Sequence, residues 1–194
     1  MKAFLQFREQ AVFLRESTGS TSIETTLLKA LKVLKLFKIP HYVCGGFAVQ
    51  EHGFPRLTVD VNIIVPDVQF AREKLSMNGF KQNPGSKMTL TDRESGVEID
   101  VLPGGGKVRR GPVTFPMPPK VSDKPQVLTL VELISLKLSS YMGSPFDRAR
   151  DYGDVAELIK ANHPPRQLGV DPKVQDEYYK IWDGLHRSGH KQRI

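Results

Sequence analysis

Residues 41–65, HYVCGGFAVQEHGFPRLTVDVNIIV, contain the pattern that decides the fold. A short apolar run stops at Gly45-Gly46, an amphipathic stretch follows, and a second apolar run carries Asp60 and Asn62 two positions apart. A strand sends alternate side chains to opposite faces, so Thr58, Asp60 and Asn62 are expected on one face and the apolar side chains between them on the other. The segment therefore predicts strand, glycine turn, short helix and second strand.

A third oxygen-bearing side chain comes from residues 97–102, VEIDVL, where apolar residues alternate with Glu98 and Asp100. If this strand lies beside the second strand, Asp60, Asn62 and Asp100 converge on one hard cation. Mg²⁺ prefers such oxygen ligands and commonly retains a nucleotide's phosphates in its shell. The pattern predicts a Mg²⁺ site, with Mn²⁺ as a substitute.

This order of parts resembles the DNA polymerase beta-like nucleotidyltransferase superfamily, in which a Gly-Gly or Gly-Ser turn precedes D-x-D or D-x-E and a third Asp on a later strand. Gly45-Gly46, Asp60-Val61-Asn62 and Asp100 fill these positions in order. The surrounding residues look like small stand-alone nucleotidyltransferases, including those of type IV toxin–antitoxin and abortive-infection systems. The resemblance covers residues 41–102 and, more loosely, 126–161.

The resemblance implies a Mg²⁺-dependent, ATP- or other NTP-binding transferase that moves a nucleoside monophosphate to a hydroxyl acceptor. Asp60 and Asp100 are then the expected catalytic residues, with Asn62 as a weak third metal ligand. The positions expected at the nucleotide are Gly45, Gly46, Thr58 and Lys137. For Thr58, a plain strand-surface role is an equal alternative.

Asn62 departs from the family pattern, because a neutral amide stands where a second acidic residue is usual. A removed unit charge about 4 Å from a divalent ion weakens the attraction by several kcal/mol at an effective dielectric of ~20. Glu98 shares the predicted face of Asp100 and is a candidate for restoring that charge. Two functions follow: an active nucleotidyltransferase, or a non-catalytic protein of the same fold that binds nucleotide, RNA or a protein partner.

The remaining pattern predicts an α/β (α+β) nucleotidyltransferase fold, with a mixed sheet flanked by helices and a helical C-terminal extension. Three regions are expected: an N-terminal helical segment (1–20), a nucleotidyltransferase core (21–125) and a helical C-terminal subdomain (126–194). Helices are expected over 4–17, from 21 to Pro40, 46–53, 67–79, 129–142, 147–162 and 171–187, and strands over 41–44, 58–65, 87–93 and 97–102.

Residues 104–120, GGGKVRRGPVTFPMPPK, are too rich in Gly and Pro for continuous regular structure. Their glycine run lies next to Lys107, Arg109 and Arg110, so the segment is read either as a loop that meets phosphates or as a flexible surface loop. It lacks the spacing of a P-loop.

In the C-terminal half, Lys137 and the run from Asp147 to Asp151 resemble a pattern that lies near the phosphates in small nucleotidyltransferases. Two structural readings compete with this one. Asp147 has the position of a helix N-cap, and Arg148 and Asp151 have the spacing of an ion pair.

The composition is that of an ordinary globular protein of 194 residues with a formal charge of +7. Positive charge gathers in residues 1–40 and 104–124, whereas 41–103 is acidic, a layout that suits a metal–nucleotide site beside RNA or tRNA. The lysines of residues 29–38 have helical spacing and are equally well read as a solvated helix face. The partners expected are an NTP, an RNA acceptor, and a protein partner or antitoxin.

No apolar run approaches a membrane span and no signal-peptide core is present, so a cytoplasmic protein without membrane contact is expected. The single Cys44 cannot form an internal disulfide and is assigned a packing role. His186 and His190 have i, i+4 spacing but lack ligand partners, so they do not predict zinc. His52 is expected to be structural.

Overall fold

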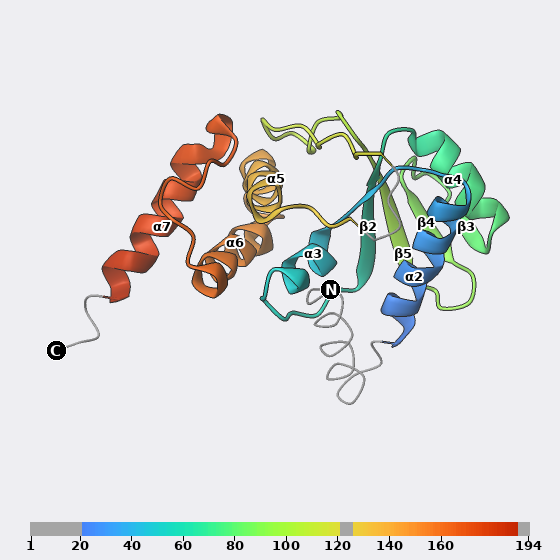
Figure 1. Ribbon diagram of the computed structural model, residues 1–194, viewed down its shortest axis with the longest axis horizontal. Helices are drawn as coiled ribbons and strands as arrows, with labels where there is room; N and C mark the ends of the chain where they lie inside the picture. Colours follow the sequence, from blue (N-terminus) through green and yellow to red (C-terminus); the bar gives the residue numbers. More distant parts are fainter. Residues whose placement is uncertain (1–20, 121–125, 190–194) are drawn as a thin grey trace.

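The computed structural model describes residues 21–120 and 126–189 (Figure 1). The helix expected over 4–17 lies outside these residues. The helices are α2 (Thr21–Leu36), α3 (Gly45–Glu51), α4 (Val68–Met77), α5 (Leu130–Gly143), α6 (Ala149–Asn162), the 3₁₀ helix η1 (Pro172–Val174) and α7 (Gln175–Gly189). The strands are β1 (Tyr42–Cys44), β2 (Asp60–Val65), β3 (Phe80–Gln82), β4 (Thr89–Asp92) and β5 (Glu98–Pro103).

The five strands form one mixed sheet in the order β1-β2-β5-β4-β3. β2 and β5 run parallel, whereas the other neighbouring pairs are antiparallel. Asn62 lies opposite Asp100 in the register of the central pair. The mixed sheet and the neighbouring placement of these two strands agree with the pattern read from the sequence.

The sheet is covered on both faces, and strand alternation divides the core accordingly. Val61 and Ile63 of β2 pack with the leucines of α2 and with α4, whereas Ile64 packs with α3 and with the buried residues of α5 and α6. Figure 1 shows α2 and α4 on one side of the strands and α5, α6 and α7 on the other. Asp60 and Asn62 alternate with Val61 and Ile63, so they point toward the side of the C-terminal helices.

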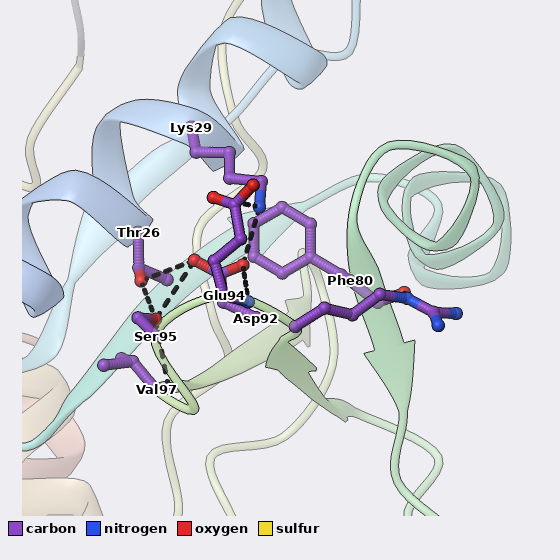
Figure 2. A network of polar contacts seen from close by, with 8 residues as sticks. Thr26, Lys29, Phe80, Asp92, Glu94, Ser95 and Val97 are labelled. Carbon is purple, nitrogen blue, oxygen red and sulfur yellow. Dashed lines mark hydrogen bonds and ion pairs between the residues drawn. The ribbon is translucent and has the colours of Figure 1, made fainter.

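A buried carboxylate joins α2 to the β4–β5 turn (Figure 2). Asp92 accepts hydrogen bonds from Lys29 Nζ at 2.7 Å and from Thr26 Oγ1 at 3.0 Å, and Ser95 Oγ donates to it at 3.1 Å. Burial alone would raise the pKa of Asp92, but these donors, with the Glu94 backbone N–H, lower the pKa overall. Lys29 is therefore committed to this contact, rather than being part of the solvated lysine face.

Strand β3 was not expected from the sequence, which predicted only a helix ending near Gly79. Its three residues include two exposed polar side chains, so it has too little apolar alternation to be recognised. Its pairing with β4 makes it an edge strand. The predicted hairpin of the next two strands is confirmed, with Gly96 in its turn at φ +72°.

The 104–120 segment has more order than either interpretation of the sequence proposed. Gly105 N–H donates to Phe115 O and Phe115 N–H donates to Gly106 O, both at 2.8 Å, so the segment folds back on itself. Val108 and Val113 are buried, and Val113 N–H donates to Ser139 Oγ of α5 at 2.9 Å. Lys107 and Arg109 therefore lie in an ordered, folded-back segment, which we call the 104–120 ribbon.

Side chains cap the N-termini of α4 and α5, but no side chain caps α6. Thr129 and Glu132 form a capping box at the start of α5, and Asp67 caps α4 by accepting from Phe70 N–H. α6, by contrast, begins after Arg148 without a side-chain cap, so the N-cap role expected for Asp147 is wrong. Asp147 instead accepts from Ser144 Oγ at 2.6 Å.

Within the described ranges, no helix is long and apolar enough to cross a lipid bilayer.

Candidate active site

Asp60, Asn62 and Asp100 lie on the same face of the central strand pair. The parallel register places Asn62 opposite Asp100 and Asp60 opposite Glu98. Asp60, Asn62 and Asp100 also line a single cavity of about 950 Å³, between the sheet and the C-terminal helices. The structure thus brings together the three side chains that the sequence singled out as metal ligands.

Two neighbouring side chains orient Asp60. Thr58 Oγ1 donates to Asp60 Oδ1 at 3.2 Å, and Asn62 Nδ2 donates to Asp60 Oδ2 at 3.0 Å. Thr58 is buried and contacts the carboxylate directly, so it is more than a strand-surface residue. Asn62 uses its amide nitrogen here, so its role in this arrangement is that of a hydrogen-bond donor to Asp60.

Asp100 is oriented by a residue that the sequence reasoning missed. Thr89 Oγ1 donates to Asp100 Oδ1 at 2.7 Å, and the two residues lie opposite each other in the β4–β5 register. Charge-assisted hydrogen bonds of this kind hold a carboxylate in one orientation. A threonine in a strand carries no distinguishing sequence signal, because only the register places it beside Asp100.

Gly45 and Gly46 are needed where α3 begins against β2. A Cβ on Gly46 would lie 2.4 Å from Thr58 Oγ1, and one on Gly45 would lie 2.8 Å from Asn62 Nδ2. Gly45 also has φ +66°, a left-handed conformation that glycine adopts most readily. Both glycines bring the backbone close to the residues that orient Asp60, and both line the cavity.

Lys137 lies at the centre of a buried ionic group in the wall of the cavity. Its Nζ is 2.8 Å from Asp151 Oδ1 and 2.6 Å from Asp154 Oδ2, and Arg56 Nε is 2.9 Å from Asp154 Oδ1. The ion pair expected between Arg148 and Asp151 is therefore wrong, because Asp151 pairs with Lys137. The group connects α5, α6 and the segment before β2. The sequence analysis assigned no role to Arg56 or Asp154, because their pairing arises from tertiary packing.

The cavity wall carries an excess of positive side chains. Its basic residues are Arg56, Lys87, Lys107, Arg109, Lys137, Arg148 and Arg150, and its acidic residues are Asp60, Asp100, Asp147 and Asp151. Arg56 and Lys137 have the carboxylate partners described above. The other five basic side chains have no ion-pair partner among the described residues.

Glu98 and the α2 lysines lie outside this arrangement, whereas Cys44 belongs to the cavity wall. Glu98 does not line the cavity and accepts from Asn83 Nδ2 at 3.1 Å, so it does not replace the missing acidic residue. The α2 lysines lie on the opposite face of the sheet. Cys44 is buried, and this burial raises the pKa of its thiol to about 12, which fits the packing role.

The histidines have structural surroundings in the part of the chain that is described. His52 Nε2 is 2.8 Å from Leu128 O, and His186 stacks on Trp182 with ring centroids 3.5 Å apart. His190 lies outside the described residues. Across residues 21–120 and 126–189, no group of three His, Cys, Asp or Glu side chains is arranged to hold a metal.

Comparison with protein families and with curated proteins gives no match. Among solved structures, the chain is similar to the solution structure of the antibiotic-resistance factor ANT(2'')-Ia, an aminoglycoside nucleotidyltransferase. The TM-score is 0.50 at 10% sequence identity, and the alignment covers 90% of this chain and 98% of that chain. The likeness is one of fold, and with the mixed sheet flanked by helices it confirms the predicted fold class.

Proposed function

We propose that this protein is a Mg²⁺-dependent nucleotidyltransferase that moves a nucleoside monophosphate from an NTP to a hydroxyl acceptor on RNA or protein. The observation that carries the proposal is the convergence of Asp60 and Asp100 on a cavity that also contains the Gly45-Gly46 turn. The fold is that of a nucleotidyltransferase, and the cavity joins two carboxylates to a wall rich in basic side chains.

The donor set fits one hard cation. Asp60 and Asp100 supply carboxylate oxygens, and Mg²⁺ in proteins is commonly held by one or two carboxylates together with the phosphates of a substrate. When bound, the ion supplies neutralisation of charge on the phosphates. Mn²⁺ suits the same oxygen donors.

The protein's own residues orient the reactants in this proposal. Thr58 and Thr89 hold the two carboxylates, and the Gly45-Gly46 turn lets a triphosphate approach the backbone closely. We assign to Asp100 the proton of the acceptor hydroxyl, whose oxygen attacks the α-phosphate of the NTP and displaces pyrophosphate. Most of the rate enhancement would come from positioning and from electrostatic stabilisation of the transferred phosphoryl group.

Asn62 favours a second candidate, a non-catalytic protein that retains nucleotide binding. Its side chain is a neutral amide, so this position adds no negative charge to the site. The amide nitrogen, and not the oxygen, is turned toward Asp60 and donates to it. The two candidates share the nucleotide site and differ in whether transfer occurs.

Calorimetric titration of Mg²⁺·ATP separates the nucleotide site from a merely structural carboxylate pair. Asp60→Ala should abolish binding. The matched control Glu98→Gln removes a nearby carboxylate that does not line the cavity, and it should bind as the wild type does. Equal binding by all three proteins would rule out a metal–nucleotide site at Asp60.

Asn62→Asp tests the position at which this sequence differs from the nucleotidyltransferase pattern. It would place a second carboxylate about 3.0 Å from Asp60, the present distance from Asn62 Nδ2 to Asp60 Oδ2. Two such charges repel by up to about 5 kcal/mol at an effective dielectric of ~20. The metal-free variant should therefore be less stable than the wild type. Mg²⁺ should bind to the variant at least about tenfold more tightly than to the wild type, because relief of only ~1.4 kcal/mol of this repulsion corresponds to a tenfold gain in affinity.

Transfer itself is measured with each labelled NTP, Mg²⁺ or Mn²⁺, and total RNA and protein extracts. Label that enters either extract with the wild type but not with Asp60→Ala supports the enzyme. Nucleotide binding without transfer by either the wild type or Asn62→Asp supports the non-catalytic candidate.

A further inference from the structure

The mouth of the cavity combines unpaired positive charge with exposed apolar side chains. The five basic residues without an ion-pair partner in the described ranges come from three separate segments: Lys87, Lys107, Arg109, Arg148 and Arg150. Like charges held together around one opening raise the local concentration of anions. Arg109 and Lys107 are presented by the ordered 104–120 ribbon, and Arg148 and Arg150 by the start of α6.

Phe146 lies in the connection between α5 and α6, directly before the cavity residues Asp147 and Arg148, and it is 100% exposed. Phe146 itself does not line the cavity, but two apolar side chains that do, Val59 and Met88, are also exposed. A flat aromatic side chain beside cationic groups suits a ligand that offers both phosphates and unpaired bases, because any base can stack on such a ring.

We propose that this rim binds a single-stranded nucleic acid, with Phe146 stacking on a base and the five basic side chains contacting phosphates. That the bound strand is the acceptor of the nucleoside monophosphate rests on the proposed function. That a strand binds at the rim does not depend on it. A polycationic acceptor such as an aminoglycoside would meet repulsion at this rim, so the similarity of fold to ANT(2'')-Ia does not extend to this chemistry.

The α2 lysines are not part of the rim. Lys29 is bonded to Asp92 and Glu94, and Lys32 projects from a helix that packs on the other face of the sheet. The expectation that these lysines join the 104–124 segment in one polyanion site is therefore not supported by their placement. Lys32 serves as a charge-matched control, and the exposed Met77 of α4 serves as an apolar one.

The test is the binding of a fluorescent 12-nucleotide single strand, RNA or DNA, measured by anisotropy in EDTA without nucleotide. If all five basic side chains contact phosphates, log K should fall with log salt at a slope of about −3.5, or about 100-fold between 50 and 200 mM salt. Replacing Lys107, Arg109 and Arg150 together by Gln should reduce the slope to about −1.4. Lys32→Gln should leave both the slope and the affinity unchanged.

Phe146→Ala should weaken binding about 5- to 150-fold without changing the salt slope, and Phe146→Trp should retain affinity. Met77→Ala should have no effect. Three results would overturn the proposal: no binding at 50 mM salt, equal binding of a duplex, or equally tight binding of poly-glutamate with no effect of Phe146→Ala. The last would indicate an acidic protein partner instead.

The two proposals fail separately. Oligonucleotide binding is measured without metal or nucleotide, and Mg²⁺·ATP binding is measured without an oligonucleotide. Loss of the first with retention of the second would leave the nucleotide site intact and remove only the strand-binding rim.

Discussion

Replacing Asp154 by asparagine tests the buried ionic group in the wall of the candidate site, because it removes one charge and keeps the side-chain volume. Asp154 is 2% exposed and lies 2.6 Å from Lys137 Nζ and 2.9 Å from Arg56 Nε. Removing one partner of a buried pair costs about 3–5 kcal/mol, because it leaves charge uncompensated. Lys137 keeps Asp151 at 2.8 Å, so we expect the lower end of this range, about 3 kcal/mol.

The assay is urea unfolding followed by circular dichroism, with thermal unfolding as a second measurement. A loss of about 3 kcal/mol corresponds to a melting temperature roughly 6–12 °C lower for a chain of this size. Asp183→Asn is the matched control, because Asp183 pairs with Arg166 through side chains that are 29% and 38% exposed. The pair is bidentate, so we expect a contribution at the upper end of the range for solvent-screened surface pairs, about 1 kcal/mol.

A double-mutant cycle with Lys137→Met isolates the interaction. Residues in one ionic network show coupling energies of about 0.5–3 kcal/mol, whereas independent sites add. An Asp154→Asn variant no less stable than Asp183→Asn, or additive behaviour with Lys137→Met, would refute the view that this group holds α5 and α6 against the site.

Three further substitutions or conditions follow from the geometry. Gly46→Ala should cost about 1–3 kcal/mol of stability, because its Cβ would lie 2.6 Å from Thr58 Cβ, and equal urea midpoints for variant and wild type would contradict that contact. Thr89→Val should weaken Mg²⁺·ATP binding about 5- to 10-fold through loss of its hydrogen bond to Asp100, and calorimetry showing no change would remove Thr89 from the site. Burial lowers the pKa of His41 below its ordinary 6.5, so the unfolded chain binds the proton more readily; stability should be complete above pH 6.5 and fall as the pH drops below it. Urea midpoints at pH 7.5 and 5.5 check this, and His41→Gln should show a smaller difference between them.

The local sequence determined which residues form the two central strands and which of their side chains share a face. Alternation in DVNIIV and VEIDVL places Asp60, Asn62 and Asp100 opposite the apolar residues of their strands, and that alternation is a property of the extended backbone. Helices were expected to begin at residues 67 and 129, and the structure places the N-caps of α4 and α5 at Asp67 and Thr129. Where such signals were weak, as at Asp147 and in β3, the local reading was wrong or incomplete.

The partners of these residues were decided only by the tertiary structure. Thr89 reaches Asp100 through strand register, and Asp154 reaches Arg56 through the packing of α6 beside a loop nearly a hundred residues earlier in the chain. Glu98 has the face parity of Asp100, yet it bonds to Asn83 and stays out of the cavity. Periodicity specifies the direction of a side chain from its own strand or helix. Long-range contacts depend on how separate elements pack, and no local pattern encodes that arrangement.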